Sequence, residues 1–244
     1  MISAIVLTRN SQERIQKCLG ALIWCDEIVV VDDFSTDGTL DKIKGAKVYQ
    51  RKLDNDFAAQ RNFGLSKSTH DWILFVDDDE IVNNKLVQEI KKVVKSGKYA
   101  GHFLSRRDYF FGRFLSHGET ASVKFLRLAR KNSGVWERRV HENWQVAGPV
   151  GQLVTPLDHF PHQTTSDFLS SINQYTTIDA IELQRQGKPF SILKTILFPP
   201  GKFVQNYLLR LGLLDGMVGL IMAFMMSFYS LVVRIKQYDF SRNS

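Results

Sequence analysis

The sequence predicts an α/β protein in which a mostly parallel sheet is flanked by helices and followed by a helical, membrane-associated C-terminal appendage. Three observations lead to this prediction. Strand-like apolar runs alternate with helical patterns over the first hundred residues, which is typical of βαβ units. Polar and acidic residues follow three of these runs. The composition then changes abruptly after residue 189, where apolar residues become dominant.

The elements of the first hundred residues are predicted from apolar runs and from residues that begin or end helices. β-Favouring residues predict strands over 3–7, 27–32, 47–49 and 72–76. Helices are predicted between them, over 10–22, up to about 45, over 56–67 and over 83–95. Asn10 with Glu13 predicts the beginning of the first helix, and Gly97 predicts the end of the last one.

Two further parts are expected after residue 100. Residues 101–163 are β-rich and irregular, and residues 164–244 are expected to form helices. Within the second part, 164–186 is helical in pattern and mostly polar, and Pro199-Pro200-Gly201 predicts a hinge. Residues 216–233 form an 18-residue run without a charged residue.

The composition is that of a globular protein with a basic surface. The chain has 244 residues, a net charge of +7 and 44% hydrophobic residues, so it can bury a core and suits an anionic partner. Cys18 and Cys25 have no metal-ligand partner nearby in the sequence and are expected to be reduced thiols of a cytosolic protein. The N-terminus opens directly into a strand-like run, so no signal peptide is expected.

Polar groups end three predicted strands: Thr8 to Asn10, Asp32-Asp33, and Asp77 to Asp79. Right-handed crossovers place these ends on one edge of a parallel sheet, where ligands bind in such folds. Carboxylates gathered there repel one another unless a cation or hydrogen-bond donors offset the charge. Mg²⁺ takes one or two carboxylates together with substrate phosphates. The alternative for the acidic run is a solvated turn that caps the next helix.

No glycine-rich phosphate loop is present in the sequence, so the phosphates of a nucleotide would be held by metal and basic side chains. Asp32 or Asp33 would then accept hydrogen bonds from the base or ribose. Nucleic-acid binding would explain the positive charge but neither the carboxylates nor the apolar C-terminal run, and no nucleic-acid partner is expected.

Several segments together resemble the family 2 glycosyltransferases, and among them the bacterial lipopolysaccharide-core β-glucosyltransferase group: IVLTRNSQER, VVVDDFSTDGT, AAQRNFGLSKSTHDWILFVDDDE and RRVHENW. The resemblance covers essentially the whole chain. It implies the GT-A fold, inversion at the anomeric carbon, a UDP-sugar donor and a divalent metal, Mg²⁺ or Mn²⁺. Residues 1–100 would then bind the nucleotide sugar, and 101–163 the acceptor.

The resemblance also implies roles for individual residues. Thr8 and Asp33, with Asp32 beside it, would line the uridine pocket, and Arg61 would support the nucleotide. Asp77 and Asp79 would be the Asp-x-Asp pair that reaches the metal and the sugar diphosphate. Asp78 lies between them, where the group often has a small residue, and this leaves open which two carboxylates bind. For Arg61 the alternative is a charge on the helix surface.

An inverting transfer needs a base for the acceptor hydroxyl, and Glu142 is the predicted base. It stands in a polar break between apolar runs, and its Val-His-Glu segment matches a motif of the family. His141 beside it is expected to contact the donor, although the His-Glu pair could equally lie in a surface loop. His159 is a candidate metal ligand or diphosphate contact. Arg127 could meet the leaving diphosphate through its bidentate fork, or be a strand-face charge.

The C-terminal run is expected to associate with the cytoplasmic face of the bacterial inner membrane as a peripheral or monotopic helix pair. Eighteen apolar residues are at the lower limit of a span. Basic residues on both flanks disfavour a clean span and favour an anionic membrane surface. The alternative is a buried helix of a homo-oligomer, in which Gly212, Gly216 and Gly219 permit close contact. The resembled group also carries a Gly-x-Leu-Asp-Gly element, which this chain has over residues 212–216, and its role does not follow from the sequence.

The expected function is therefore transfer of a hexose, glucose favoured, from a UDP-sugar to a hydroxyl of a lipopolysaccharide-core or other glycolipid acceptor. A polyprenyl-phosphate sugar synthase shares the first three motifs, but its phosphate acceptor needs no strong base. A non-catalytic sugar-nucleotide-binding scaffold at the membrane is the alternative of a different class.

Overall fold

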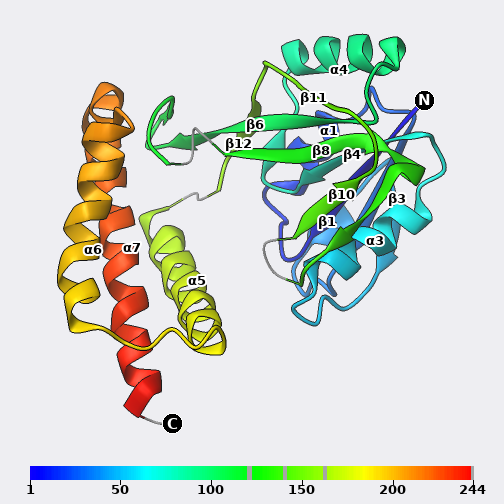
Figure 1. Cartoon of the computed structure of the whole chain (residues 1–244). Coiled ribbons are helices and arrows are strands. Elements are labelled where there is room, and N and C mark those ends of the chain that lie inside the picture. Colours follow the sequence, from blue (N-terminus) through cyan, green and yellow to red (C-terminus); the bar gives the residue numbers. More distant parts are fainter. Residues whose placement is uncertain (120–122, 140–141, 162–163, 243–244) are drawn as a thin grey trace. The chain divides into compact units, whose positions relative to one another are not determined.

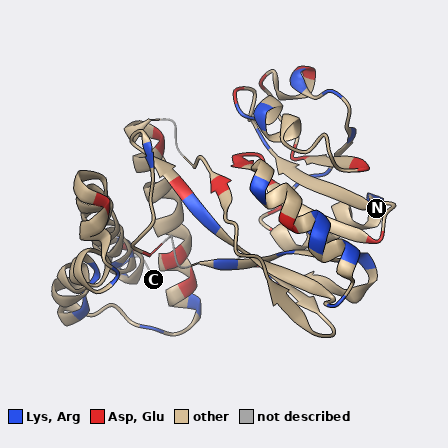
Figure 2. Ribbon diagram, turned by 90° about the horizontal axis from the view of Figure 1, so that it is seen from above, with Lys and Arg blue, Asp and Glu red and all other residues tan. Residues whose placement is uncertain are grey.

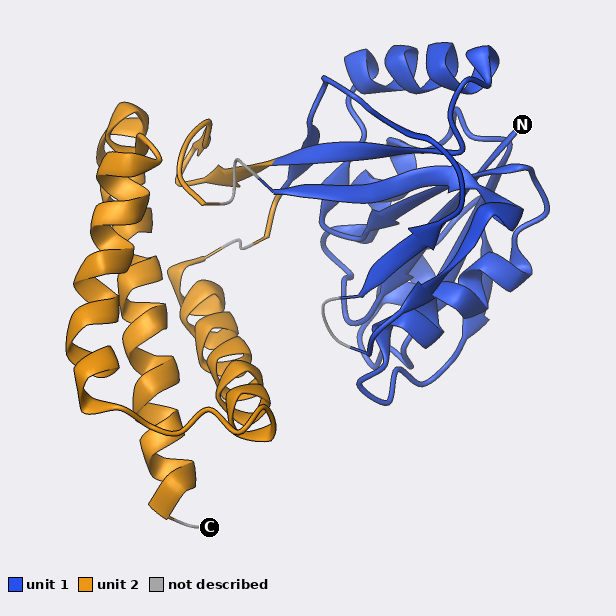
Figure 3. Cartoon of the chain, viewed as in Figure 1, with its two compact units in different colours: residues 1–106, 123–159 blue, residues 107–122, 160–244 orange. Residues whose placement is uncertain are grey.

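The chain forms two compact units in a computed structural model that describes residues 1–119, 123–139, 142–161 and 164–242. Unit 1 comprises residues 1–106 and 123–159, and unit 2 comprises residues 107–122 and 160–244 (Figure 3). The segment 107–122, which the sequence groups with the β-rich middle part, thus belongs with the C-terminal helices.

The centre of unit 1 is a sheet in which β3, β2, β1, β4, β8 and β6 lie side by side in that order. The strands β1 to β4 run parallel, and β8 and β6 continue the sheet antiparallel. This confirms the predicted α/β class with a parallel N-terminal half. The strands of the unit are β1 (Ile2–Thr8), β2 (Glu27–Asp32), β3 (Lys47–Gln50), β4 (Trp72–Asp77), β5 (Glu80–Ile81), β6 (Gly101–Phe110, whose last residues extend into unit 2), β8 (Lys124–Arg130), β9 (Gly134–Glu137), β10 (Asn143–Val146), β11 (Val150–Gln152) and β12 (Leu157–His159).

Both faces of β1, β2 and β4 are buried, which explains their continuous apolar sequences. Val6 and Leu74 face one hydrophobic cluster, and Ile5 and Phe75 face the other. The helices of the unit, seen around the sheet in Figure 1, are α1 (Ile15–Gly20), α2 (Thr39–Lys42), α3 (Phe57–Lys67) and α4 (Asn84–Ser96).

Two of the predicted helix boundaries are confirmed by their caps, and one is wrong. Asp56 accepts a hydrogen bond from the backbone N–H of Ala59 at the start of α3, and Gly97 ends α4 with φ 61°. Asn10, however, does not begin a helix. It has φ 50°, and its side-chain oxygen accepts from the N–H of Thr36 at 2.8 Å. This bond joins the loops after β1 and β2, and α1 begins later.

Unit 2 is a helical bundle in which α7 packs against both α5 and α6 (Figure 1). Its elements are β7 (Arg113–Phe114), α5 (Thr165–Arg185), α6 (Ile192–Val204), a π-helical turn η3 (Gln205–Leu209), a short 3₁₀ helix η4 (Gly212–Asp215) and α7 (Gly216–Arg242). The helix α5 begins with the capping box of Thr164 and Asp167. Within the described residues, one helical stretch, Gly212–Arg242, is long and apolar enough to cross a membrane by length and composition.

The predicted hinge at Pro199-Pro200-Gly201 is wrong, because α6 continues through both prolines. Pro199 is buried, and its carbonyl accepts a hydrogen bond from Ser227 of α7 at 2.7 Å. Phe203 also packs against Phe224 of α7, with ring centroids 4.7 Å apart. These contacts with the neighbouring helix compensate for the N–H groups that the prolines lack.

The structure gives a role to the 212–216 element, which the sequence left unexplained. The Asp215 carboxylate is buried and accepts hydrogen bonds from the backbone N–H groups of Ser116 and His117, the latter at 2.9 Å. Its other oxygen lies 3.1 Å from Nδ1 of His117. Asp215 therefore ties the segment 107–122 to the turn between α6 and α7.

Candidate functional site

The ends of β1, β2 and β4 meet at one edge of the sheet, which we call the rim. Thr8 pairs in register with Asp32, and Leu7 pairs with Asp77. The three polar strand ends therefore lie at the same height of the sheet, as the crossover argument predicts. The N–H of Asp33 also donates to the carbonyl of Thr8 at 3.0 Å, which fixes the β2 end against β1.

Asp77 is held by two arginines from different elements. Arg61 on α3 donates to it at 3.0 Å, and Arg127 on β8 at 2.7 Å. Both arginine side chains are almost fully buried. Burial alone would raise the pKa of Asp77, but the charges of Arg127 and Arg61 outweigh it and lower that pKa. Asp77 is therefore ionised and anchors two cations at the rim.

The other two aspartates have different partners. Asp78 accepts hydrogen bonds from Thr8 at 2.7 Å and from Ser11 at 2.5 Å. Burial raises the pKa of Asp78, and the Ser11 hydroxyl offsets part of that rise. Asp79 instead faces His159, with the imidazole Nε2 3.3 Å from its carboxylate. His159 reaches this position because β12 pairs with β5 immediately after the acidic run.

The residues around Asp79 fit a divalent cation only as a partial ligand set. Among the residues that the structure describes, no group of three His, Cys, Asp or Glu side chains is placed to share a metal. Asp79 and His159 are two adjacent groups that can each contribute a ligand. Mg²⁺ commonly takes one or two carboxylates and completes its shell with water and substrate phosphates. This donor set therefore suits a cation that a diphosphate helps to hold.

Asp32 and Asp33 are both buried at the end of β2. Asp32 accepts from the N–H and hydroxyl of Ser35 and from Gln50, and these bonds shape the turn after the strand. Asp33 accepts from Arg9 at 2.9 Å. Its second oxygen takes the N–H of residue 53 at 2.9 Å. The end of β2 thus presents two buried carboxylates whose positions are fixed by hydrogen bonds, and the exposed Arg9 is bonded to one of them.

Glu142 is brought to the rim by Arg61, whose Nε donates to the Glu142 carboxylate at 3.0 Å. Since the same guanidinium binds Asp77, a single arginine links the predicted base to the acidic strand end. The planar guanidinium of Arg61 also lies over the ring of Trp136, with its Cζ 4.8 Å from the ring centroid. Glu142 is largely buried, with 18% of its side chain exposed. His141, the neighbouring predicted contact, lies outside the described residues.

The hairpin β9–β10, which leads to Glu142, is fixed by residues that sequence reasoning missed. Trp136 and Trp144 stack at 5.4 Å, and each meets Phe75 of β4 edge-on. Asn62 of α3 accepts from the N–H of Trp136 at 2.9 Å and donates to its carbonyl at 2.8 Å. The amide thus pairs with both backbone groups, as a neighbouring strand would. Only the two tryptophans in a short β-like run hint at this in the sequence.

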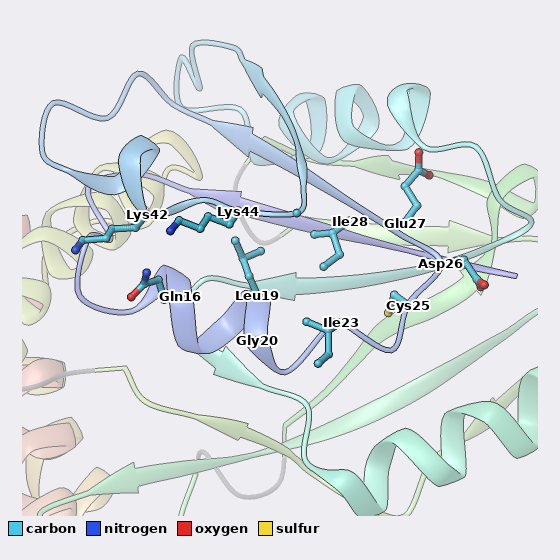
Figure 4. Close-up of a pocket in the computed structure, with 11 residues that line it drawn as sticks. Gln16, Leu19, Gly20, Ile23, Cys25, Asp26, Glu27, Ile28, Lys42 and Lys44 are labelled. Carbon is cyan, nitrogen blue, oxygen red and sulfur yellow. The ribbon is translucent and has the colours of Figure 1, made fainter.

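A separate pocket lies at the opposite end of β2. It has a volume of about 390 Å³ and is bounded by α1, α2 and the first residues of the strand (Figure 4). Leu19 and Ile28 give it an apolar floor, and Lys42 and Lys44 lie at its edge. None of the predicted site residues lines it.

Comparison with known sequences identifies the family. A profile described as "Glycosyl transferase family 2" matches residues 3–145, which include the rim, Arg61 and Glu142. The chain belongs to glycosyl transferase family 2. Its glycosyltransferase relatives include LpsC of Rhizobium meliloti, a lipopolysaccharide core biosynthesis glycosyltransferase, 28% identical over 92% of this chain and 89% of LpsC. An uncharacterized glycosyltransferase of Rickettsia typhi is 24% identical over 93% of this chain and 83% of its own length.

Solved structures that resemble the chain have low sequence identity to it. TarS of S. aureus, in a complex with UDP-GlcNAc, is 15% identical with a TM-score of 0.49 over 100% of this chain and 92% of that one. Glucosyl-3-phosphoglycerate synthase from Mycobacterium tuberculosis, with Mn²⁺, UDP and phosphoglyceric acid, is 18% identical with a TM-score of 0.49 over 78% of this chain and 80% of that one.

Proposed function

We propose that this glycosyltransferase is an inverting, metal-dependent hexosyltransferase. It moves a hexose, glucose favoured, from a UDP-sugar to a hydroxyl of a lipopolysaccharide-core or other glycolipid acceptor. The observation that supports this most is the Arg61 bridge, which joins Glu142 to Asp77 at the family's strand-end motif. The similarity to LpsC over nearly the whole chain supports the acceptor class.

The proposed reaction is a single displacement. The Glu142 carboxylate takes the proton of the acceptor hydroxyl while that oxygen forms a bond to the anomeric carbon. The bond from this carbon to the diphosphate oxygen breaks, and UDP leaves with the electron pair, so the configuration inverts. Arg127 lies at the rim where it can contact the leaving diphosphate. The nucleotide would be oriented by Thr8, Asp32 and Asp33, and His141 would also contact the donor.

A divalent cation, Mg²⁺ or Mn²⁺, would neutralise charge on the diphosphate when bound. Asp79 and His159 are its first candidate ligands, because they are adjacent and Asp79 forms no ion pair with an arginine among the described residues. Asp77, the third predicted ligand, would have to exchange one of its arginine contacts to reach the ion.

A panel of nucleotide sugars tests the function. UDP release is measured with each donor, with and without Mn²⁺ and with and without membrane lipid extract. We expect release with a UDP-hexose that requires both metal and lipid. Donor binding without any release, under all acceptors tried, would instead support the non-catalytic scaffold.

The Glu142→Gln variant tests the base. General-base catalysis contributes about 10²–10⁴-fold, so turnover should fall by that factor while donor binding persists. Glu137→Gln is the matched control, because Glu137 is exposed in the same hairpin. Near-normal turnover of Glu142→Gln with a polyprenyl phosphate as acceptor would favour the polyprenyl-phosphate sugar synthase.

A lipid-linked acceptor requires the enzyme to meet a membrane. We therefore propose that the protein works at the cytoplasmic face of the bacterial inner membrane, attached through unit 2 to an anionic membrane surface. A homo-oligomer formed through the C-terminal helices is the competing role for the same segment.

A further inference from the structure

We infer that α6 and α7 dock as a pair on an anionic lipid bilayer, lying in its plane with one apolar side immersed, rather than crossing it. The apolar side is defined by exposed residues of the two helices and of the η3 turn that follows α6, and it includes Leu193, Leu197, Val204, Leu208, Met217 and Phe224. This inference deepens the membrane part of the proposed function, and its test needs no transferase activity.

The exposure of this side is far greater than a water-facing helix pair would normally have. Leu193 is 66% exposed and Met217 is 70% exposed. Leu193, Leu197, Val204 and Leu208 recur at spacings of four and seven residues, which places them along one stripe of a continuous helical stretch. In the apolar window of α7 only 28% of the residues are buried inside the protein. An exposed apolar surface of this extent marks a membrane or protein contact.

The charges around the apolar side match an anionic membrane. Between residues 183 and 238 the sequence contains seven Lys or Arg residues and a single acidic residue, Asp215. Lys202 and Arg210 are paired with Glu119, so the excess positive charge comes from the other five. Asp215 is buried and its carboxylate is bound by backbone N–H groups, so it presents no negative charge to a surface. In Figure 2 most of the ribbon of α6 and α7 is tan, the colour of residues other than Lys, Arg, Asp and Glu. Basic residues beside an apolar helix face attract anionic lipids.

The packing of α5 argues against a span. The helix α5 lies along α7 and is linked to it by Tyr229, whose hydroxyl donates to Asp179 at 2.7 Å. Lys236 of α7 also donates to Asn173 and Thr177 of α5, the latter at 2.7 Å. The exposed side of α5 is mostly polar. If α7 crossed the bilayer, α5 would enter the hydrocarbon core with it, and its polar groups would lose water without gaining partners.

The turn between α6 and α7 is held in the same way. Asp215 binds the N–H groups of Ser116 and His117, and the N–H of Gly118 donates to the Arg210 carbonyl at 3.0 Å. A hairpin that dips into a bilayer tip-first would have to carry this polar segment with it. Immersion of the long side is therefore the arrangement that leaves these polar contacts intact.

A second copy of the chain is the competing occupant of the apolar side. Two of the three glycines that the sequence offered for helix association, Gly212 and Gly219, are already used within the chain. A Cβ on Gly219 would lie 1.9 Å from the Gly212 carbonyl oxygen, and one on Gly212 would lie 2.7 Å from that of Asn206. These close approaches join η3, η4 and α7 of one molecule. Gly212 and Gly219 are therefore not available as a small-residue seam for a partner helix.

Co-sedimentation of the full chain with vesicles tests the inference. The vesicles are phosphatidylcholine alone or with phosphatidylglycerol, and we expect binding that the anionic lipid strengthens. The double variant Leu193→Glu/Leu197→Glu should bind at least about tenfold more weakly. The control Leu169→Glu/Ile181→Glu, which alters exposed apolar residues of α5, should bind like the wild type. Equal loss in both variants, or no vesicle binding together with a dimer that only the first variant dissociates, would overturn the inference.

Cysteine labelling distinguishes lying on the membrane from crossing it. Single variants Leu193→Cys, Leu208→Cys and Ser170→Cys are treated with a membrane-impermeant maleimide on vesicles. The native thiols form a quiet background, because burial raises the pKa of Cys25 to about 12 and that of Cys18 as well. Positions 193 and 208 should both be protected while 170 stays reactive. Protection at all three positions indicates a span, and reactivity at all three refutes docking through this side.

Discussion

The substitution Asn62→Ala tests whether helix α3 positions the predicted base. It removes both hydrogen bonds to the backbone of Trp136 without touching the rim. Trp136 is buried, so its N–H and carbonyl would lose partners that water cannot readily replace. An unsatisfied buried group costs about 1–3 kcal/mol. With partial relaxation of the hairpin we expect about 2 kcal/mol of lost stability and a melting temperature lower by about 4–8 °C.

The loosened hairpin should affect turnover more than donor binding. A displacement of about 1 Å at a reacting group can reduce the rate about 10²-fold, so we expect kcat to fall at least about tenfold while the donor KM changes by less than about threefold. Ser66→Ala is the control, because the Ser66 hydroxyl donates to the Phe63 carbonyl within its own helix. If Asn62→Ala has a lower melting temperature yet keeps the wild-type kcat, the hydrogen bonds between Asn62 and Trp136 stabilise the fold and do not position the base.

Two further substitutions probe the carboxylates that hold the fold. Burial alone would raise the pKa of Glu27, but hydrogen bonds, first from Lys47, lower it from 4.5 to about 2. Its stabilising contribution, about 3 kcal/mol, is therefore present above pH 4.5 and lost as the pH falls towards 2. Denaturant unfolding should show the stability difference between wild type and Glu27→Gln shrinking over that range, and a constant difference would contradict this. Asp215→Asn should speed amide hydrogen exchange at Ser116 and His117 by at least about tenfold, whereas the control Asp239→Asn, at an exposed position, should not. Unchanged exchange in Asp215→Asn would show that this carboxylate does not hold Ser116 and His117 in place.

The strands and their acidic ends could be predicted because they depend on local sequence and simple topology. The run from Trp72 to Asp77 is apolar and β-favouring, and parallel connections leave its end beside those of β1 and β2. The hairpin of Trp136 and Trp144 could not be placed in this way, since its position depends on packing against Phe75.

The partners of individual side chains were also beyond the sequence. Three consecutive aspartates look alike in the chain, yet Asp77 binds arginines, Asp78 binds hydroxyl groups and Asp79 faces a histidine. Residues from β8, from β12 and from the end of β1 with the loop after it decide this, and they lie far away in the sequence. The hinge predicted at Pro199 was wrong for the same reason, because contacts with α7, which the sequence does not show, keep α6 intact.

The central claim is that acidic side chains from separate strands serve one sugar nucleotide through one cation, and calorimetry tests it most directly. UDP-glucose is titrated into the wild type, Asp79→Asn and the control Asp71→Asn, which alters an exposed carboxylate outside the rim, each with and without Mn²⁺. We predict binding to the wild type and Asp71→Asn that is stronger with Mn²⁺, and loss of this metal-dependent part in Asp79→Asn. Binding that is equal in all three proteins and indifferent to Mn²⁺ would contradict the claim.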